Sequence, residues 1–121
     1  IVKVNLLVLK ENIMEVTATL IEKKDNGKYL SIHFDDNSKF NILSELLRVE
    51  SPSADVQGHG GPKIIVRNKG NVLIDQIEPV GNYAIRIIFS DNHSSGIYSW
   101  GLLHDFGKNH DKYLQEYYNS L

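Results

Sequence analysis

The feature that most constrains the fold of this chain is the complete absence of cysteine from its 121 residues. Without cysteine the chain can form no disulfide bond, no thiolate-ligated zinc site and no iron–sulfur cluster from its own residues. The fold must therefore depend on the burial of apolar side chains, and a domain of this length buries ~65% of its unfolded surface. Hydrophobic residues make up 41% of the sequence, which predicts one domain with an ordinary core and no structural cofactor.

The charge of the chain is nearly balanced, with 13 Lys and Arg residues against 15 Asp and Glu residues. A net charge of -2 argues against general attraction to nucleic acid or to an anionic membrane surface. The apolar run at residues 6–9 is shorter than the ~7 residues of a signal peptide and the ~20 of a membrane span. We therefore expect a cytoplasmic protein with no nucleic-acid or membrane partner.

Apolar residues recur at period two in several short runs, which predicts β-strands. The turn signal Asp25-Asn26-Gly27 between two such runs indicates a hairpin. Later in the chain, four apolar residues share one face of an expected strand: Tyr83, Ile85, Ile87 and Phe89. Strands are predicted at residues 16–21, 29–34, 40–42, 64–66, 72–77 and 83–89.

Helical periodicity appears at three places. Leu43, Leu46 and Leu47 predict a short helix after the third strand. Ser99 is a candidate N-cap for a helix that begins at Trp100 and ends at Gly107. A terminal helix after Asp111 has an apolar stripe that we expect to lie across the sheet: Leu114, Tyr117, Tyr118 and Leu121. Strands followed by C-terminal helices predict an α+β fold with a mainly antiparallel sheet.

Three longer segments carry a family resemblance: residues 45–60 (ELLRVESPSADVQGHG), 78–84 (EPVGNYA) and 91–100 (DNHSSGIYSW). Together they resemble a bacterial family of unknown function that is similar to the N-terminal domain of gamma-butyrobetaine hydroxylase. The resemblance covers residues 17–121. Residues 1–16 fall outside it, as an N-terminal extension or an expression remnant.

The resemblance implies an accessory role for the domain. In the hydroxylases, iron and 2-oxoglutarate occupy a separate and larger domain, which this chain does not contain. Related domains are also fused to P-loop ATPases of the Mrp type that carry iron–sulfur clusters. The resemblance therefore implies a protein partner such as a metalloenzyme or an iron–sulfur carrier.

The resemblance also implies which residues of this chain correspond to the ligands of a zinc site in the hydroxylases. Its three cysteines would correspond to Ser51, Ser53 and Val56, and its histidine to His93. Valine cannot bind a metal, and neutral serine hydroxyls are poor zinc ligands compared with thiolate or imidazole. The zinc site therefore does not carry over to this chain, and His93 alone remains as a candidate ligand.

A replacement metal site is the alternative that the residues leave open. His93 and His59 would be its ligands, joined by Asp55 or His104, and such a set suits zinc, iron or nickel. These histidines have no local ligand spacing, however. A histidine among glycines is also an ordinary hydrogen-bonding loop residue.

The sequence motifs give less support to an enzymatic function. His33, Asp35 and His93 copy the HxD…H order of non-haem iron oxygenases, but an oxygenase fold needs more strands than this chain can supply. The glycine-rich stretch at residues 57–62 lacks the Lys-Ser/Thr of a P-loop, and no GxSxG motif is present. We therefore expect no catalytic residues.

The sequence as a whole predicts a non-catalytic interaction domain whose surface is centred on residues 50–61 and 91–100. Arg48, Glu50 and Arg86 are candidates for one ion-pair network in it, and Asp91 is a candidate to orient His93. The residues expected on this surface are Arg48, Glu50, Asp55, His59, Asn82, His93, Tyr98 and Trp100.

Overall fold

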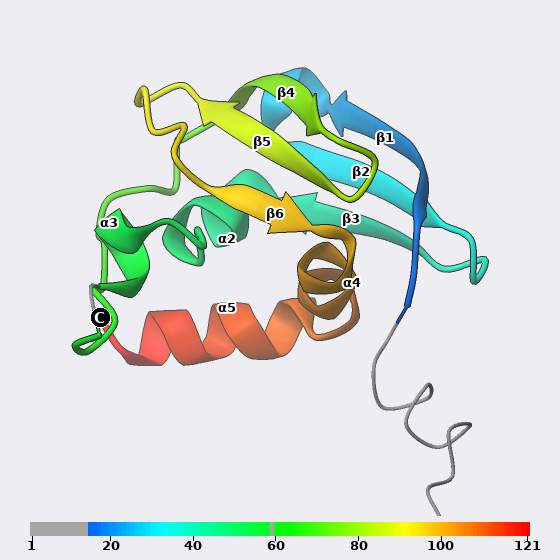
Figure 1. Ribbon diagram of the computed structural model, residues 1–121. Helices are drawn as coiled ribbons and strands as arrows, with labels where there is room; N and C mark the ends of the chain where they lie inside the picture. The colour runs from blue at the N-terminus through cyan, green and yellow to red at the C-terminus, as the bar shows by residue number, and fades with distance from the viewer. Residues whose placement is uncertain (1–14, 59) are drawn as a thin grey trace, which may run out of the picture.

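The computed structural model describes residues 15–58 and 60–121, and it shows an α+β fold with two three-stranded antiparallel sheets (Figure 1). The first sheet has the order β1-β2-β3, and a single 3-10 turn, η1, joins β1 to β2. The second sheet has the order β4-β5-β6. The bounds are β1 Ala18–Lys24, η1 Asp25–Gly27, β2 Tyr29–Phe34, β3 Lys39–Leu43, β4 Ile74–Val80, β5 Ala84–Phe89 and β6 Ile97–Ser99.

The helices gather on one side of the two sheets (Figure 1). They are α2 (Ser44–Val49), α3 (Ala54–Gln57), α4 (Trp100–Lys108) and α5 (His110–Asn119). Within the described ranges, no helix is long and apolar enough to cross a membrane.

The core lies between the two sheets and under the helices. Because strand side chains alternate between faces, β2 buries every second residue, and β5 does the same at Ile85, Ile87 and Phe89. Each fully buried aliphatic side chain contributes about 1.5–3 kcal/mol. The core residues that are completely inaccessible are Leu30, Ile32, Ile42, Leu46, Leu47, Ile87, Phe89, Tyr98 and Leu103.

The second sheet departs from the sequence prediction at its boundaries. Residues 64–66 form no strand, and Tyr83 lies outside β5 with 59% of its surface exposed. Pro79 falls inside β4 and pairs with Ile85, although proline has no N–H to donate to a strand ladder. β4 is an edge strand, where a missing donor on the open side costs no ladder hydrogen bond.

The first C-terminal helix confirms one predicted signal and corrects another. The Ser99 side chain accepts a hydrogen bond from Leu102 N at 3.2 Å, so it is the predicted N-cap of α4. Gly107 does not end α4, because the helix continues to Lys108. A Cβ at Gly107 would lie 2.3 Å from the Phe40 ring, so this glycine permits close packing on β3.

The last helix packs on other helices instead of across a sheet. α5 lies alongside α2 and α4, and Tyr117 is the residue that it buries. Tyr118 and Leu121 of the predicted stripe are 48% and 49% exposed. The predicted helical period is correct, but the part of α5 that other elements cover is narrower than the predicted apolar stripe.

Candidate functional site

Two buried serines and the half-buried His93 join the segment after α2 to the turn after β5. Ser51 Oγ lies 2.9 Å from His93 Nε2, and Ser53 Oγ lies 3.3 Å from the same nitrogen. The two hydroxyl oxygens are 3.3 Å apart. We call Ser51, Ser53 and His93 the Ser–His cluster. It connects two segments separated by about 40 positions, so it holds the residues on either side of it in one fixed surface.

Close backbone approach explains how the cluster is built. Ser51 is fully buried and Ser53 is 7% exposed. A Cβ at Gly96 would lie 2.5 Å from Ser51 Oγ, so a glycine is needed where β6 begins. Tyr98 follows two residues later and is also fully buried, with its hydroxyl donating to Leu47 O at 2.6 Å. The prediction that Tyr98 lies on the surface is therefore wrong, and burial raises the pKa of this phenol.

An ion-pair group adjoins the Ser–His cluster. Arg48 Nε and Lys69 Nζ lie 2.9 Å and 2.8 Å from the same Asp91 oxygen, and the other oxygen accepts from His93 N at 3.3 Å. Partial burial opposes ionisation of Asp91, but the hydrogen bonds from Lys69 and Arg48 outweigh it and lower the pKa to about 2. Asp91 thus fixes the backbone of His93 and not its ring.

Two effects favour the neutral form of the His93 imidazole. Burial lowers the pKa of His93, and the nearby Arg48 guanidinium lowers it further. A neutral ring has one donor and one acceptor nitrogen, so the serine hydroxyls complement Nε2 in either tautomer.

A shallow polar hollow opens above the cluster. Asp55 and Ser95 bridge its two sides, with the Ser95 hydroxyl donating to Asp55 Oδ2 at 3.3 Å. Asp55, Asn92 and Ser95 are exposed at its rim. The side chains that line it are Arg48, Asp55, Asp91, Asn92, His93, Ser94 and Ser95. The structure thus brings together Arg48, Asp55 and His93 from the predicted surface.

Other predicted surface residues lie elsewhere. Trp100 Nε1 donates to Asn82 O at 2.9 Å, and Trp100 follows the last residue of β6 whereas His93 precedes the first. Glu50 pairs with Lys63 at 2.5 Å and does not line this hollow. His59 lies outside the described residues.

The predicted ion-pair network of Arg48, Glu50 and Arg86 is wrong. Arg48 pairs with Asp91 and Glu50 pairs with Lys63. Arg86 meets Glu78 across β4 and β5 at 3.6 Å. Sequence reasoning missed Lys69 as a partner of Asp91. It is a loop lysine with no local pattern, and only the tertiary fold could identify it.

The remaining histidine candidates do not join His93. His104 is 5% exposed, lies edge-on to the rings of Phe34 and Phe40, and meets Asp36 Oδ2 with its Nε2 at 2.9 Å. Within the part of the chain that the structure describes, no three His, Asp or Glu side chains form a metal-binding group. The HxD…H order of His33, Asp35 and His93 is therefore a coincidence of sequence.

The zinc site implied by the resemblance can be tested on the Ser–His cluster. Ligand atoms around a tetrahedral zinc lie roughly 3.3–3.8 Å apart, given zinc bonds of about 2.0–2.3 Å. Only the contact between Ser51 and His93, at 2.9 Å, is shorter than this, and the other two, at 3.3 Å, lie at the lower limit; all three are hydrogen-bond contacts. The fourth position is Val56, which offers no donor atom. With two neutral serine hydroxyls and a valine at the positions of the three cysteines, the residues present do not fit zinc.

Comparisons with known proteins identify the family. The family model described as "Gamma-butyrobetaine hydroxylase-like, N-terminal" matches residues 21–104. Two solution NMR structures resemble the chain with TM-scores of 0.77 and 0.75, at 40% and 33% identity. The first covers 90% of this chain and 82% of its own, and the second 87% and 83%.

A crystal structure also matches, from a protein of unknown function in the DUF971 family of Acidithiobacillus ferrooxidans. It shares 28% identity and a TM-score of 0.63, over 75% of this chain and 92% of its own. A search among curated proteins gave no match. With its fold and most of its length matched, this chain belongs to the gamma-butyrobetaine hydroxylase-like N-terminal domain family.

Proposed function

We propose that this chain is a non-catalytic interaction domain that binds a protein partner through one face, made of residues 51–57 and 91–95. We call this the α3 face. The observation that carries the proposal is the hydrogen-bonded Ser–His cluster, which links the two segments. A surface fixed before binding loses less conformational entropy when a partner docks. Above the cluster, Asp55, Asn92 and Ser95 present polar groups to solvent.

The chemistry of the cluster favours binding over catalysis. A serine nucleophile must reach its substrate, whereas Ser51 is fully buried. A catalytic histidine also needs a group that orients its ring, and Asp91 instead serves Arg48, Lys69 and the His93 backbone. These contacts suit a structural lock beneath a recognition surface.

The class of partner follows from the family resemblance. Fusions of related domains to Mrp-type ATPases favour an iron–sulfur carrier, and the hydroxylases favour a metalloenzyme. We propose the iron–sulfur carrier first, because such a fusion keeps the domain beside a protein that functions with it.

The test is an NMR titration of the isotopically labelled chain with the Mrp-type ATPase of the same organism. We expect shift changes concentrated at residues 53–57 and 91–95, and an affinity about tenfold weaker for Asp55→Arg. Asp111→Arg is the matched control, because Asp111 is fully exposed at the start of α5. Saturable binding that leaves the α3 face unperturbed, or equal weakening by both variants, would reject the α3 face.

Metal binding through His93 and His59 is the alternative function. One observation favours it: the lowered pKa keeps the His93 imidazole neutral, which is the form that binds metal. Elemental analysis of protein purified without an affinity tag decides this question. About one equivalent of zinc or iron, lost in His93→Ala, would support the alternative, and less than about a tenth of an equivalent would reject it.

A further inference from the structure

Tyrosine hydroxyls attach the later turns of α5 to the rest of the domain. Among the residues of α5 only Tyr117 is buried, three are half-buried and the other six are exposed. The Tyr117 hydroxyl donates to Val66 O at 2.7 Å, and the Tyr118 hydroxyl donates to Glu45 at 2.5 Å. Because a helix in a protein is stabilised mostly by packing of an apolar face, α5 depends strongly on these hydrogen bonds.

The segment that Tyr117 contacts is also held by few interactions. Residues 62–68 form no helix or strand, and Ile64 among them is 49% exposed. We call these residues the strap. Besides the bond from α5, the strap is held by the Ile64 N–H, which donates to Val56 O at 2.7 Å, and by Lys63, which pairs with Glu50 at 2.5 Å. The strap therefore depends on polar contacts and buries little apolar surface.

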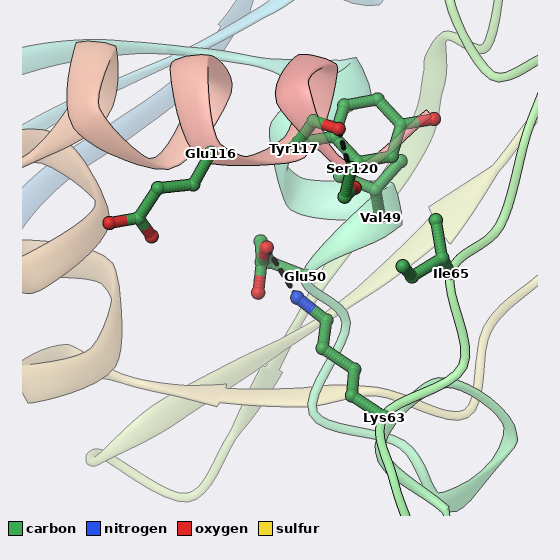
Figure 2. Close-up of a pocket in the computed structure, with 7 residues that line it drawn as sticks. All are labelled: Val49, Glu50, Lys63, Ile65, Glu116, Tyr117 and Ser120. Atoms are coloured by element: carbon green, nitrogen blue, oxygen red, sulfur yellow. Dashed lines mark hydrogen bonds and ion pairs between the residues drawn. The ribbon is translucent and has the colours of Figure 1, made fainter.

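The strap and α5 meet around one hollow, which Figure 2 shows together with the segment at the end of α2. Val49 lines this hollow beside Tyr117, and Phe106 packs edge-on against Tyr113 of α5 with ring centroids 5.1 Å apart. Val49 and Phe106 are each only 2% exposed. Release of the strap and α5 would therefore expose apolar surface that they now cover.

The neighbouring elements are packed more tightly. Leu103 of α4 is fully buried, and a Cβ at Gly107 would lie 2.3 Å from the Phe40 ring of β3. At the start of α5, the Leu43 N–H donates to His110 Nε2 at 3.1 Å. α4 is thus fixed on the first sheet, and α5 is anchored to β3 at its first residue.

We propose that the strap and α5 form a latch that opens as one unit while the two sheets and α4 stay folded. Segments with few buried apolar contacts open at a lower free energy than the core of the same protein. The hydrogen bond from Tyr117 to Val66 joins the two parts directly, so loss of one weakens the other. The open form exposes Val49 and Phe106, and the latch controls access to this apolar surface. The proposal does not depend on the α3 face.

The test is native-state hydrogen exchange of the isotopically labelled chain, followed by NMR at a pH where exchange reports the opening equilibrium. Amides 114–118 report on α5, the hydrogen-bonded Ile64 amide reports on the strap, and the amides of β5 report on the core. We expect the α5 and Ile64 amides to share one protection factor that is lower than that of β5. Protection of α5 equal to that of β5 would overturn the proposal.

Two variants test whether the latch opens as one unit. Tyr118→Phe removes a contact of α5 alone, and Lys63→Met removes a contact of the strap alone. Each variant should accelerate exchange of both the α5 amides and the Ile64 amide, by roughly two- to tenfold. Acceleration confined to the altered element would show that the two parts open separately and would overturn the proposal.

Ile87→Val is the matched control in the core, because Ile87 of β5 is fully buried. It should accelerate exchange of the β5 amides by roughly two- to tenfold. The latch amides should be unchanged, since β5 is folded in both the closed and the open form. Equal acceleration of the β5, α5 and Ile64 amides would show that the latch opens only when the whole domain unfolds, and the proposal would be wrong.

Discussion

Removal of the His93 imidazole should reveal how strongly the Ser–His cluster stabilises the fold. In His93→Ala the hydroxyls of Ser51 and Ser53 remain buried, and their mutual contact at 3.3 Å satisfies only one of them. The other loses its partner, which costs about 1–3 kcal/mol. We expect urea unfolding, followed by Trp100 fluorescence, to show a loss of this size. His33→Ala, on the half-buried outer side of β2, is the matched control and should change stability by less than about 0.5 kcal/mol.

A double-mutant cycle with Ser51→Ala sharpens this prediction. Ser51→Ala alone leaves His93 in contact with Ser53 at 3.3 Å, so the loss should be about 0.5–1.5 kcal/mol. When both residues are replaced, the Ser53 hydroxyl is the one buried hydroxyl left without a partner, and His93→Ala alone already leaves one such hydroxyl, so the total should fall short of the sum by about 1 kcal/mol. Additive losses, within about 0.3 kcal/mol, would refute the hydrogen-bonded lock.

Three further predictions follow from the same contacts. Because the pKa of Asp91 falls from 3.8 to about 2 on folding, its ionisation stabilises the fold above about pH 4, and this contribution is lost as the pH falls toward about 2. Asp91→Asn should therefore lose stability at pH 7 and show a shallower dependence of its melting temperature on acid pH. An unchanged acid profile would contradict this. Gly107→Ala should cost about 1–3 kcal/mol in urea unfolding, since its methyl group would overlap the Phe40 ring, whereas the solvent-facing Gly61→Ala should cost far less. A chelator should leave the melting temperature unchanged because the Ser–His cluster does not fit zinc, and a clear drop would show that a metal stabilises the fold.

Local signals explain what the sequence could predict. The Ser99 cap and the alternation of Ile85, Ile87 and Phe89 depend on neighbours only a few residues apart, and the structure confirms both. Gly107 resembled a helix end because its partner, Phe40, is distant in sequence. The edge position of β4, which tolerates Pro79, is likewise a property of the assembled sheet.

The same distinction between local signals and contacts of distant residues applies to the candidate site. The family resemblance related Ser51, Ser53 and His93, and the structure places them in contact. Charge partners were not predictable, because Lys69 precedes β4 and Asp91 follows β5, and only the pairing of these two strands brings them together.

The most direct test of the central claim is photo-crosslinking in living cells of the source organism, with a photoreactive amino acid at position 55 of the α3 face. We expect one discrete protein adduct from position 55, its loss when Ser95→Arg is added, and no such adduct from position 111. The same adduct from both positions, or none from position 55, would contradict the claim that this domain works by docking through the α3 face.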